Sequence, residues 1–168
     1  MSQLPVDEVD GLVAAWRRER PDLDVAPLEV LSRVSRLARH LDLARREAFD
    51  THGLEPWEFD VLAALRREGP PYALSPGRLL QVTLVTSGTM TNRIDRLEAK
   101  RLVGRVPDPN DGRGVQVVLT GEGRARVDDA LTDLLAHERS ILAALPLHDR
   151  DLLADLLRRL TVPFDTAD

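Results

Sequence analysis

Apolar residues recur every three to four positions along most of this chain, which is the spacing of helices that bury one face. The helices predicted from this spacing cover about residues 11–20, 27–50, 55–67, 121–145 and 148–160. The first helix is expected to carry Leu12, Ala15 and Trp16 on one side. The polar residues 1–10 before it are expected to be frayed.

The same spacing predicts the inward faces of two later helices. In the helix over residues 55–67 the inward residues are Trp57, Val61, Leu62 and Leu65. In the helix over residues 121–145, which Thr120 or Gly121 is expected to cap, they are Val127, Ala130, Leu131, Leu134 and Leu135.

Residues 75–120 follow a different plan. They read as a short helix, a turn and a second helix, in which Met90, Ile94 and Leu97 recur on one face. After Leu102 the apolar period changes to two, and a loop rich in Pro, Asp, Asn and Gly separates two short strands. A helix-turn-helix followed by a β-hairpin is a winged helix. The predicted fold class is therefore mainly α with a small β-hairpin wing.

The second helix of this stretch leaves a polar and basic face. It begins at Thr86, Ser87 and Gly88, small residues that can cap an N-terminus. Its early turns carry hydroxyl, amide and guanidinium groups, which can bond to phosphates and base edges. The candidate DNA contacts on this helix are Ser87, Thr89, Thr91, Asn92, Arg93 and Arg96.

The turn-rich loop adds Asp111 and Arg113 to the candidate DNA-binding residues. A loop of this composition can hold Arg113 at a tip, from which its guanidinium could enter a narrow minor groove. An ordinary hairpin with a solvated arginine is the alternative, and the preceding helix pair favours the wing. If Arg113 contacts DNA, Arg113→Ala should weaken binding and make it less sensitive to salt.

Charge is distributed unevenly along the 168 residues, which carry a net charge of −5. Residues 75–120 hold seven Lys or Arg and four Asp or Glu, a net +3, whereas the rest holds 16 and 24, a net −8. The overall charge argues against non-specific coating of DNA or of anionic membranes. Specific binding requires only a basic docking face, and this stretch provides one.

Several classes of function are disfavoured. The chain has no cysteine, which excludes disulfides, thiolate metal sites and thiol-based redox sensing. It shows no signal-peptide pattern and no apolar run near the ~18 residues that cross a bilayer, so the expected location is cytoplasmic. The histidines have no metal-ligand spacing, and no phosphate-cradling glycine loop occurs. We expect no enzyme activity, no metal and no cofactor.

The terminal helices have more apolar surface than a small winged helix needs to cover, which predicts a partner surface. A two-fold homodimer is the commonest arrangement. The predicted domains are an N-terminal extension over residues 1–27, a winged-helix domain over 28–160 and a tail over 161–168. Within that domain the DNA-binding core covers residues 54–120, and the dimerisation helices cover 28–50 and 121–160.

The order of these helices and two segments resemble the MarR family of bacterial winged-helix regulators. The segments are LSPGRLL…TSGTMTNRIDRLEAKRLV and the wing DPNDGRGVQVVLTGEG, and the similarity covers about residues 28–160. The wing signature of the family is matched at Asp111, Arg113, Val117, Leu119 and Thr120. Gly112 departs from the pattern, because a basic residue often stands at that position in the family.

The N-terminal helix with Trp16 resembles a narrower subgroup, the urate-responsive and PecS-like regulators. In that subgroup an added helix contributes a tryptophan to an anion pocket that also contains an Asp and two Arg. The positions that fit are Trp16, Asp60, Arg67 and Arg105. Without the resemblance, Trp16 reads as an anchor for the extra helix, and Asp60 and Arg67 read as solvated charges two helical turns apart. The choice of Arg67 over Arg66 rests on spacing.

The resemblance implies a homodimer that binds a pseudo-palindromic operator in double-stranded DNA. It further implies a repressor that is released by a small anionic ligand such as urate. The alternative is a helical dimer that mediates protein contacts without ligand-controlled DNA binding. The operator sequence, the regulated genes, the natural ligand and the choice between repression and activation stay open at this point.

Overall fold

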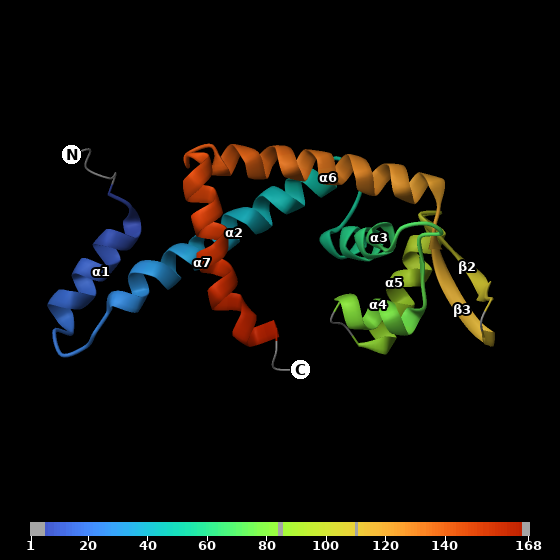
Figure 1. Cartoon of the computed structure of the whole chain (residues 1–168), viewed down its shortest axis with the longest axis horizontal. Coiled ribbons are helices and arrows are strands. Elements are labelled where there is room, and N and C mark those ends of the chain that lie inside the picture. Colours follow the sequence, from blue (N-terminus) through green and yellow to red (C-terminus); the bar gives the residue numbers. More distant parts are fainter. Residues whose placement is uncertain (1–5, 84–85, 110, 166–168) are drawn as a thin grey trace. The chain divides into compact units, whose positions relative to one another are not determined.

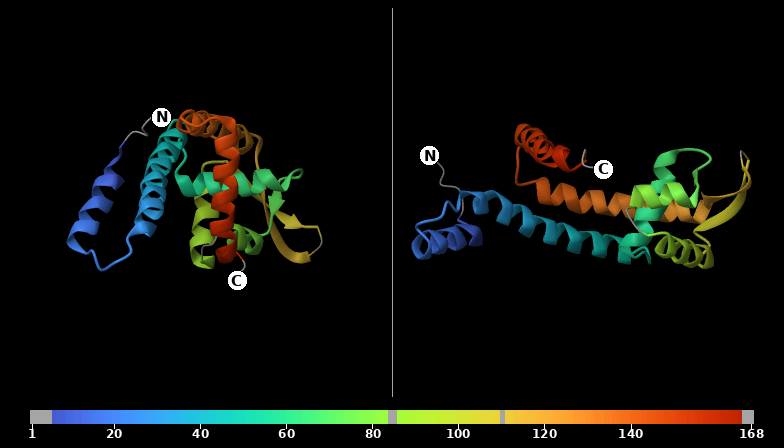
Figure 2. Two further views of the ribbon diagram at one scale, coloured as in Figure 1. Left: turned by 60° about the vertical axis from the view of Figure 1, so that its left-hand side comes forward. Right: turned by 90° about the horizontal axis from the view of Figure 1, so that it is seen from below.

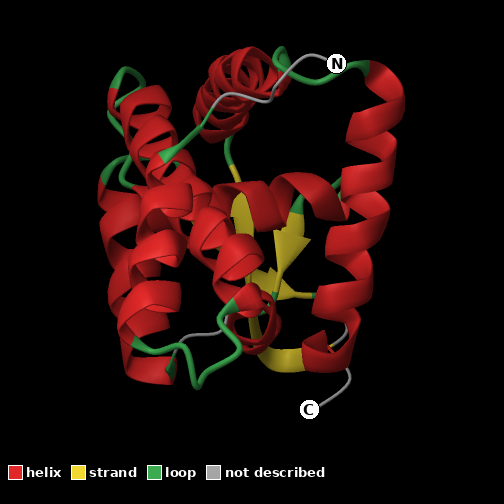
Figure 3. Cartoon of the chain, turned by 90° about the vertical axis from the view of Figure 1, so that its left-hand side faces the viewer, coloured by secondary structure: helices red, strands yellow, loops and turns green. Residues whose placement is uncertain are grey.

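Figure 1 shows the computed structural model of the chain, which describes residues 6–83, 86–109 and 111–165, without the side chains of residues 112, 113 and 165. The chain forms two compact units, Met1–Arg45 and Arg46–Asp168. Helices make up most of the described residues, and the strands form one small sheet (Figure 3). No helix among the described residues is long and apolar enough to cross a membrane.

The first unit contains α1 (Glu8–Glu19) and most of α2 (Ala26–Asp50). The prediction of frayed residues up to position 10 is wrong for residues 7–10, because Asp7 and Asp10 form a capping box, while residues 1–5 lie outside the described residues. The Asp7 carboxylate accepts from the backbone N–H of Val9 at 2.8 Å, and the Asp10 carboxylate accepts from that of Asp7 at 2.8 Å. These bonds satisfy the free donors of the first turn and start the helix at Glu8.

The buried side of α1 also differs from the prediction. Val9 and Val13, one turn apart, pack with Val25 in a small cluster. Trp16 is 47% exposed, and Leu12 is exposed as well. The earlier start of the helix adds Val9 to the apolar pattern, so the stripe from Val9 to Val13 forms the buried side.

Ion pairs join the two helices of the first unit. Arg33 of α2 donates to Asp7 at 2.8 Å and to Asp10 at 2.7 Å, and Arg17 pairs with Glu29 at 2.5 Å. The capping carboxylates of α1 are therefore held by a guanidinium of α2.

The second unit contains the predicted helix-turn-helix and wing. Its elements are α3 (Pro56–Glu68), β1 (Ala73–Leu74), α4 (Pro76–Thr83), α5 (Ser87–Ala99), β2 (Val103–Asp108), β3 (Asp111–Leu119), α6 (Gly121–Leu142) and α7 (Leu147–Asp165). In Figures 1 and 2, α4, α5 and the β2–β3 hairpin lie together near the N-terminal end of α6. The hydrophobic core of the second unit includes the stacked rings of Phe49 and Phe59, with centroids 4.1 Å apart.

The sheet has the antiparallel order β1-β3-β2. Strand β1 was not predicted, because two residues carry no periodic pattern and its place depends on pairing with β3, Ala73 opposite Val118 and Leu74 opposite Val117. Strand β1 fixes the base of the β2–β3 hairpin against the segment that leads into α4.

Helix α6 is capped by Thr120, one of the two caps that the sequence allowed. The Thr120 hydroxyl accepts from the Gly123 N–H at 3.0 Å. Val127, Ala130 and Leu134 are buried as predicted, whereas Leu131 and Leu135 are exposed. The two leucines lie one position further along the chain, about 100° around the helix from the buried stripe.

Helix α7 is longer than predicted and buries none of its described side chains. Leu152, Leu156 and Leu160 follow one another at intervals of one turn and are 56%, 44% and 51% exposed. The prediction of an apolar stripe here is confirmed, and the stripe is uncovered within the single chain.

Candidate nucleic-acid interface

Helix α5 has one buried face and one polar face. Met90, Ile94 and Leu97 are buried in the core of the second unit, as the spacing predicts. The four shorter polar residues among the candidates, Ser87, Thr89, Thr91 and Asn92, are exposed. Because the apolar face is fixed by packing, the polar face has a defined direction.

The hydroxyl groups of this face are partly organised by the helix itself. Thr86, the N-cap residue, and Thr89 have hydroxyl oxygens 2.9 Å apart. The Thr91 hydroxyl donates to the Ser87 carbonyl at 3.2 Å, which leaves its oxygen lone pairs for an external donor. No protein partner of the Asn92 side chain is found among the described residues, so its amide is open to a ligand.

The first turn of α3 lies beside the two arginines of α5. The guanidinium carbons of Arg93 and Arg96 lie 5.3 and 4.8 Å from the centroid of the Trp57 ring. Arg96 also pairs with Glu55, with 2.6 Å between Nη2 and Oε1, and the Trp57 indole N–H donates to the other Glu55 oxygen at 2.6 Å. These two donors lower the pKa of Glu55, the indole first and Arg96 second.

Trp57 was expected in the core and is instead only partly buried. It occupies the first turn of α3, on the same stripe as the buried Val61 and Leu65, at the edge where α5 passes. A hollow of about 540 Å³ opens at this edge. It is lined by Glu55, Trp57, Gly88, Thr89, Asn92, Arg93 and Arg96. The sequence does contain a pattern that could have indicated this cluster. It is a tryptophan two residues after a glutamate, followed on a later helix by two arginines one turn apart.

An exposed lysine and a buried glutamate form a second ion pair at the C-terminal end of α5. Glu58 on α3 is 0% exposed, and Lys100, the C-cap residue of α5, places its ammonium 2.7 Å from the Glu58 carboxylate. The Glu58 carboxylate also accepts from the backbone N–H of Glu55 at 2.9 Å. The first turn of α3 therefore contacts the C-terminal end of α5 through two pairs of charged groups, Glu55 with Arg96 and Glu58 with Lys100. The sequence reasoning singled out neither Glu58 nor Lys100.

Arg105, predicted as a ligand residue, links the wing to α5, the second helix of the helix-turn-helix and here called the recognition helix. It lies on β2 and pairs with two carboxylates of α5, Asp95 at 2.5 Å and Glu98. The Asp95 carboxylate is the main cause of a raised pKa for Arg105. Displacement of Arg105 would remove a contact between the hairpin base and α5.

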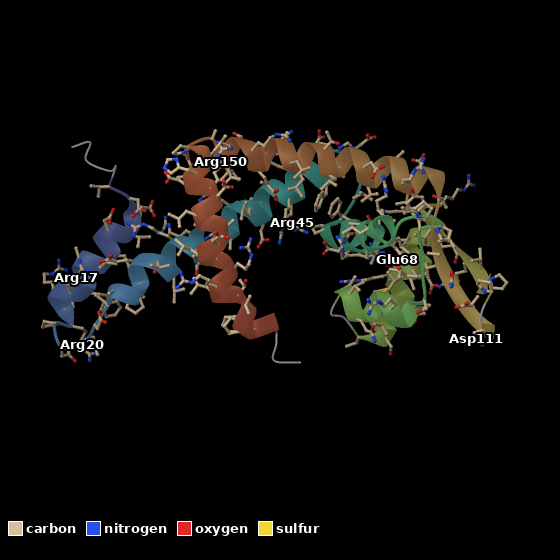
Figure 4. All side chains as sticks on the ribbon, in the orientation of Figure 1. Arg17, Arg20, Arg45, Glu68, Asp111 and Arg150 are labelled. Carbon is tan, nitrogen blue, oxygen red and sulfur yellow. The ribbon has the colours of Figure 1, made fainter. Side chains whose placement is uncertain are left out.

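The far end of the wing is marked by Asp111, which Figure 4 places at the tip of the β2–β3 hairpin. Asp108 of β2 is paired with Asp111 across the turn. The side chain of Arg113, the predicted minor-groove residue, lies outside the described residues. Its backbone belongs to β3, two residues from Asp111.

The other predicted ligand residues belong to both units. Trp16 of the first unit borders a mostly apolar hollow of about 400 Å³ beside Leu23, Val25 and Leu28. Asp60 and Arg67 are exposed on α3 of the second unit.

The structure distinguishes Arg67 from its neighbour Arg66. Arg66 pairs with Asp128 of α6 at 2.8 Å and lies over the Tyr72 ring at 5.2 Å. Arg67 has no ion-pair partner in the part of the chain that the structure describes. Of these two arginines, Arg67 is therefore the one whose charge is available to a ligand.

Metal ligands are not grouped anywhere in residues 6–83, 86–109 and 111–165: no three His, Asp or Glu side chains lie close enough to hold an ion. The features that the second unit does contain are an anchored helix with a polar and basic face and an adjacent hairpin. These features define a winged-helix DNA-binding protein.

Comparison with known proteins gives the family. The MarR family model matches residues 52–114. The HTH-type transcriptional regulator PecS of Dickeya dadantii is 39% identical over 152 residues, which are 90% of this chain and 92% of that protein. The chain belongs to the MarR family, and its likeness to the PecS-like subgroup is supported across most of its length.

Two solved structures extend the comparison. A mutant MarR from E. coli complexed with operator DNA has a TM-score of 0.65 and 28% identity, covering 81% of this chain and 94% of that chain. Bordetella bronchiseptica BpsR, whose DNA binding is regulated by 6-hydroxynicotinic acid, has a TM-score of 0.58 and 29% identity, covering 77% and 98%. The related proteins are non-enzymatic DNA-binding transcriptional regulators, and dimerisation and ligand response are typical of the family.

Proposed function

We propose that this protein is a homodimeric repressor that binds a pseudo-palindromic operator and is released from it by a small anionic ligand such as urate. The observation that carries the proposal is the polar and basic face of α5, held opposite a buried apolar face. The 39% identity to PecS over 90% of the chain supports the regulatory assignment.

In the proposed complex, each subunit inserts α5 into a major groove, and the two half-sites lie about one helical turn apart. Arginines of α5 or Asn92 would read bases, and the hydroxyls would hold phosphates. Asp111 and Arg113 of the wing would lie at the flanking minor groove. The proposed DNA-binding residues are Ser87, Thr89, Thr91, Asn92, Arg93, Arg96, Asp111 and Arg113.

Dimerisation is proposed through the terminal helices. The Leu152, Leu156 and Leu160 stripe of α7 is uncovered in the single chain, as are Val30 and Val34 of α2. Contiguous exposed apolar residues of this kind mark partner surfaces. A second copy of the chain would cover them and fix the distance between the two α5 helices.

The proposed ligand residues are Trp16, Asp60, Arg67 and Arg105, and likeness to the PecS-like subgroup supports the set. Arg67 would pair with the anion, which Asp60 would repel. An anion that also attracted Arg105 would compete with Asp95 and Glu98, the carboxylates of α5 that Arg105 contacts. A ligand releases DNA only if it binds the DNA-incompetent state more tightly than the competent one.

Titration with urate tests this proposal. Millimolar urate should quench tryptophan fluorescence and dissociate the complex of the dimer with its operator. Arg67→Ala should abolish the response to urate while operator binding persists. Arg66→Ala is the matched control, because Arg66 is held by Asp128 and should not contact the ligand. Retained operator binding with no quenching and no release would show that urate is not the effector.

A further inference from the structure

Arg93 and Arg96 of α5 differ in their surroundings although they lie one turn apart. Both guanidinium groups lie over Trp57, at 5.3 and 4.8 Å from the ring centroid. Arg96 has in addition a carboxylate partner, Glu55, at 2.6 Å. Arg93 has no ion-pair partner among the described residues. One ring thus contacts a paired cation and an unpaired one.

The Glu55 carboxylate restricts what Arg96 can do. Its two oxygens are used by Arg96 and by the Trp57 indole N–H, at 2.6 Å each. Transfer of Arg96 to a DNA phosphate would break this pair and leave the Glu55 charge facing a polyanion. The charge of Arg96 is therefore compensated within the protein, and Arg96 should release few counterions on DNA binding.

The Trp57 ring, in contrast to the Glu55 carboxylate, leaves the charge of Arg93 available to DNA. A guanidinium stacked on an aromatic face keeps its N–H donors at the edge, where they can bond in plane with an acceptor. The contact with the ring restrains the guanidinium group before DNA arrives, which reduces the entropy lost on binding. Arg93 also borders the 540 Å³ hollow beside Thr89 and Asn92, so this edge adjoins open space. Guanine presents O6 and N7 in the geometry that such an edge recognises.

We propose that Glu55 and Trp57 give the two arginines separate roles: Arg93 reads a guanine in the major groove, and Arg96, although it lies on the proposed DNA-binding face, stays paired with Glu55 and reads no base. The inference rests on the proposed DNA binding and deepens it, since it names the base that α5 selects. Glu55 and Trp57 become determinants of specificity, although they lie on α3 and not on the recognition helix.

The test uses the full-length dimer and a preferred duplex selected from a random pool, with an unrelated duplex of equal length for comparison. Affinities are measured at several salt concentrations for the wild type, Arg93→Ala, Arg96→Ala and Glu55→Gln. Arg93→Ala should lose about 5- to 150-fold in preference at one guanine and bind the duplex substituted there as well as the original.

The other two variants should behave differently from Arg93→Ala. Arg96→Ala should keep the guanine preference and leave the salt slope nearly unchanged. Glu55→Gln should release the charge of Arg96, so that affinity for the unrelated duplex rises and the salt slope steepens by about 0.9. Loss of about 0.9 from the slope in Arg96→Ala, or equal loss of guanine preference in both arginine variants, would overturn the assignment.

A measurement without DNA checks the cluster itself. Trp16→Phe leaves Trp57 as the one tryptophan of the chain. Its emission should shift on Glu55→Gln, because the indole N–H loses a charged acceptor, and unchanged emission would contradict the geometry. A wild-type protein that prefers no duplex would overturn both this inference and the proposed function. Sequence-specific binding with the arginine roles reversed would overturn this inference alone.

Discussion

At the scale of single residues, the charge that most constrains the fold is that of Glu58. A fully buried carboxylate loses its hydration and must be compensated by a nearby cation. Lys100 supplies that cation from the end of α5, and it also donates to the Gly53 carbonyl at 3.3 Å. The pair therefore fixes α5 at the end opposite to the first turns, which are proposed to contact DNA.

The first prediction concerns this pair. Lys100→Met should lower the free energy of unfolding by about 1 to 3 kcal/mol in urea denaturation, because it leaves the buried Glu58 carboxylate without its charged partner. The double variant Glu58→Met with Lys100→Met is the control and should recover most of the loss, since neither charge remains. A cost below about 1 kcal/mol for Lys100→Met would show that the pair does not stabilise α5.

The second prediction concerns pH and Glu55. Its pKa is lowered in the folded state from the ordinary value of 4.5 by the Trp57 indole and then by Arg96. A carboxyl with a lowered folded pKa stabilises the fold above its unfolded pKa, and that contribution is lost as pH falls through the folded pKa. The stability difference between wild type and Glu55→Gln should therefore be constant near neutral pH and shrink below about pH 4.5. A difference that does not vary with pH would contradict this assignment.

At the scale of elements, the wing and α6 approach each other closely at Gly123. A Cβ built on Gly123 would lie 2.1 Å from the backbone carbonyl oxygen of Leu102. The same carbonyl accepts from the Thr120 N–H at 3.1 Å and from its hydroxyl at 3.0 Å. The first turn of α6 therefore packs directly on the backbone that enters β2, and only glycine permits that approach.

The third prediction follows from this contact. Gly123→Ala should destabilise the protein by about 1 to 3 kcal/mol, because a backbone atom has to move. Gly121→Ala, on the same turn, is the matched control, since a Cβ there meets nothing within 4 Å. Thermal unfolding should show a lowered Tm for the first variant and an unchanged or slightly raised Tm for the second. Equal Tm values for the two variants would be inconsistent with the close approach.

Elements with long periodic patterns were predictable, and those made by tertiary contact were not. Met90, Ile94 and Leu97 gave α5 its buried face, and Thr120 gave α6 its start. Strand β1 escaped prediction because its two residues are defined by pairing with β3. Trp57 was predicted as a core residue because it has the helical spacing of the buried Val61 and Leu65. This spacing cannot show that the Trp57 ring lies at the edge of the core, beside α5.

At the scale of the whole molecule, the exposed apolar stripes require a partner. The fourth prediction is that Leu156→Glu, in the middle of the α7 stripe, converts the dimer to monomer at micromolar concentration in sedimentation. A charge there would be buried without a partner in the proposed interface. Ala154→Glu places the same charge on the opposite side of α7 and should leave the dimer intact. A monomeric wild type at this concentration would contradict the proposed assembly.

The candidate site was predictable only in part. The polar and the buried face of α5 were predicted from spacing and are confirmed by the structure, whereas the contact of the polar residues with DNA stays a prediction. The partners of those residues, Glu55, Glu58 and Lys100, come from different elements, and only the fold brings them together. The roles of Trp16, Asp60, Arg67 and Arg105 stay a prediction that rests on the family resemblance.

The central claim is that α5 and the wing bind DNA with sequence preference. The most direct measurement is a fluorescence anisotropy titration of the purified protein with a duplex from the region flanking its own gene, against an unrelated duplex of the same length and at the same salt. We predict binding of one dimer per site, at least about 1,000-fold tighter than to the unrelated duplex. Equal affinity for the two duplexes would contradict the claim.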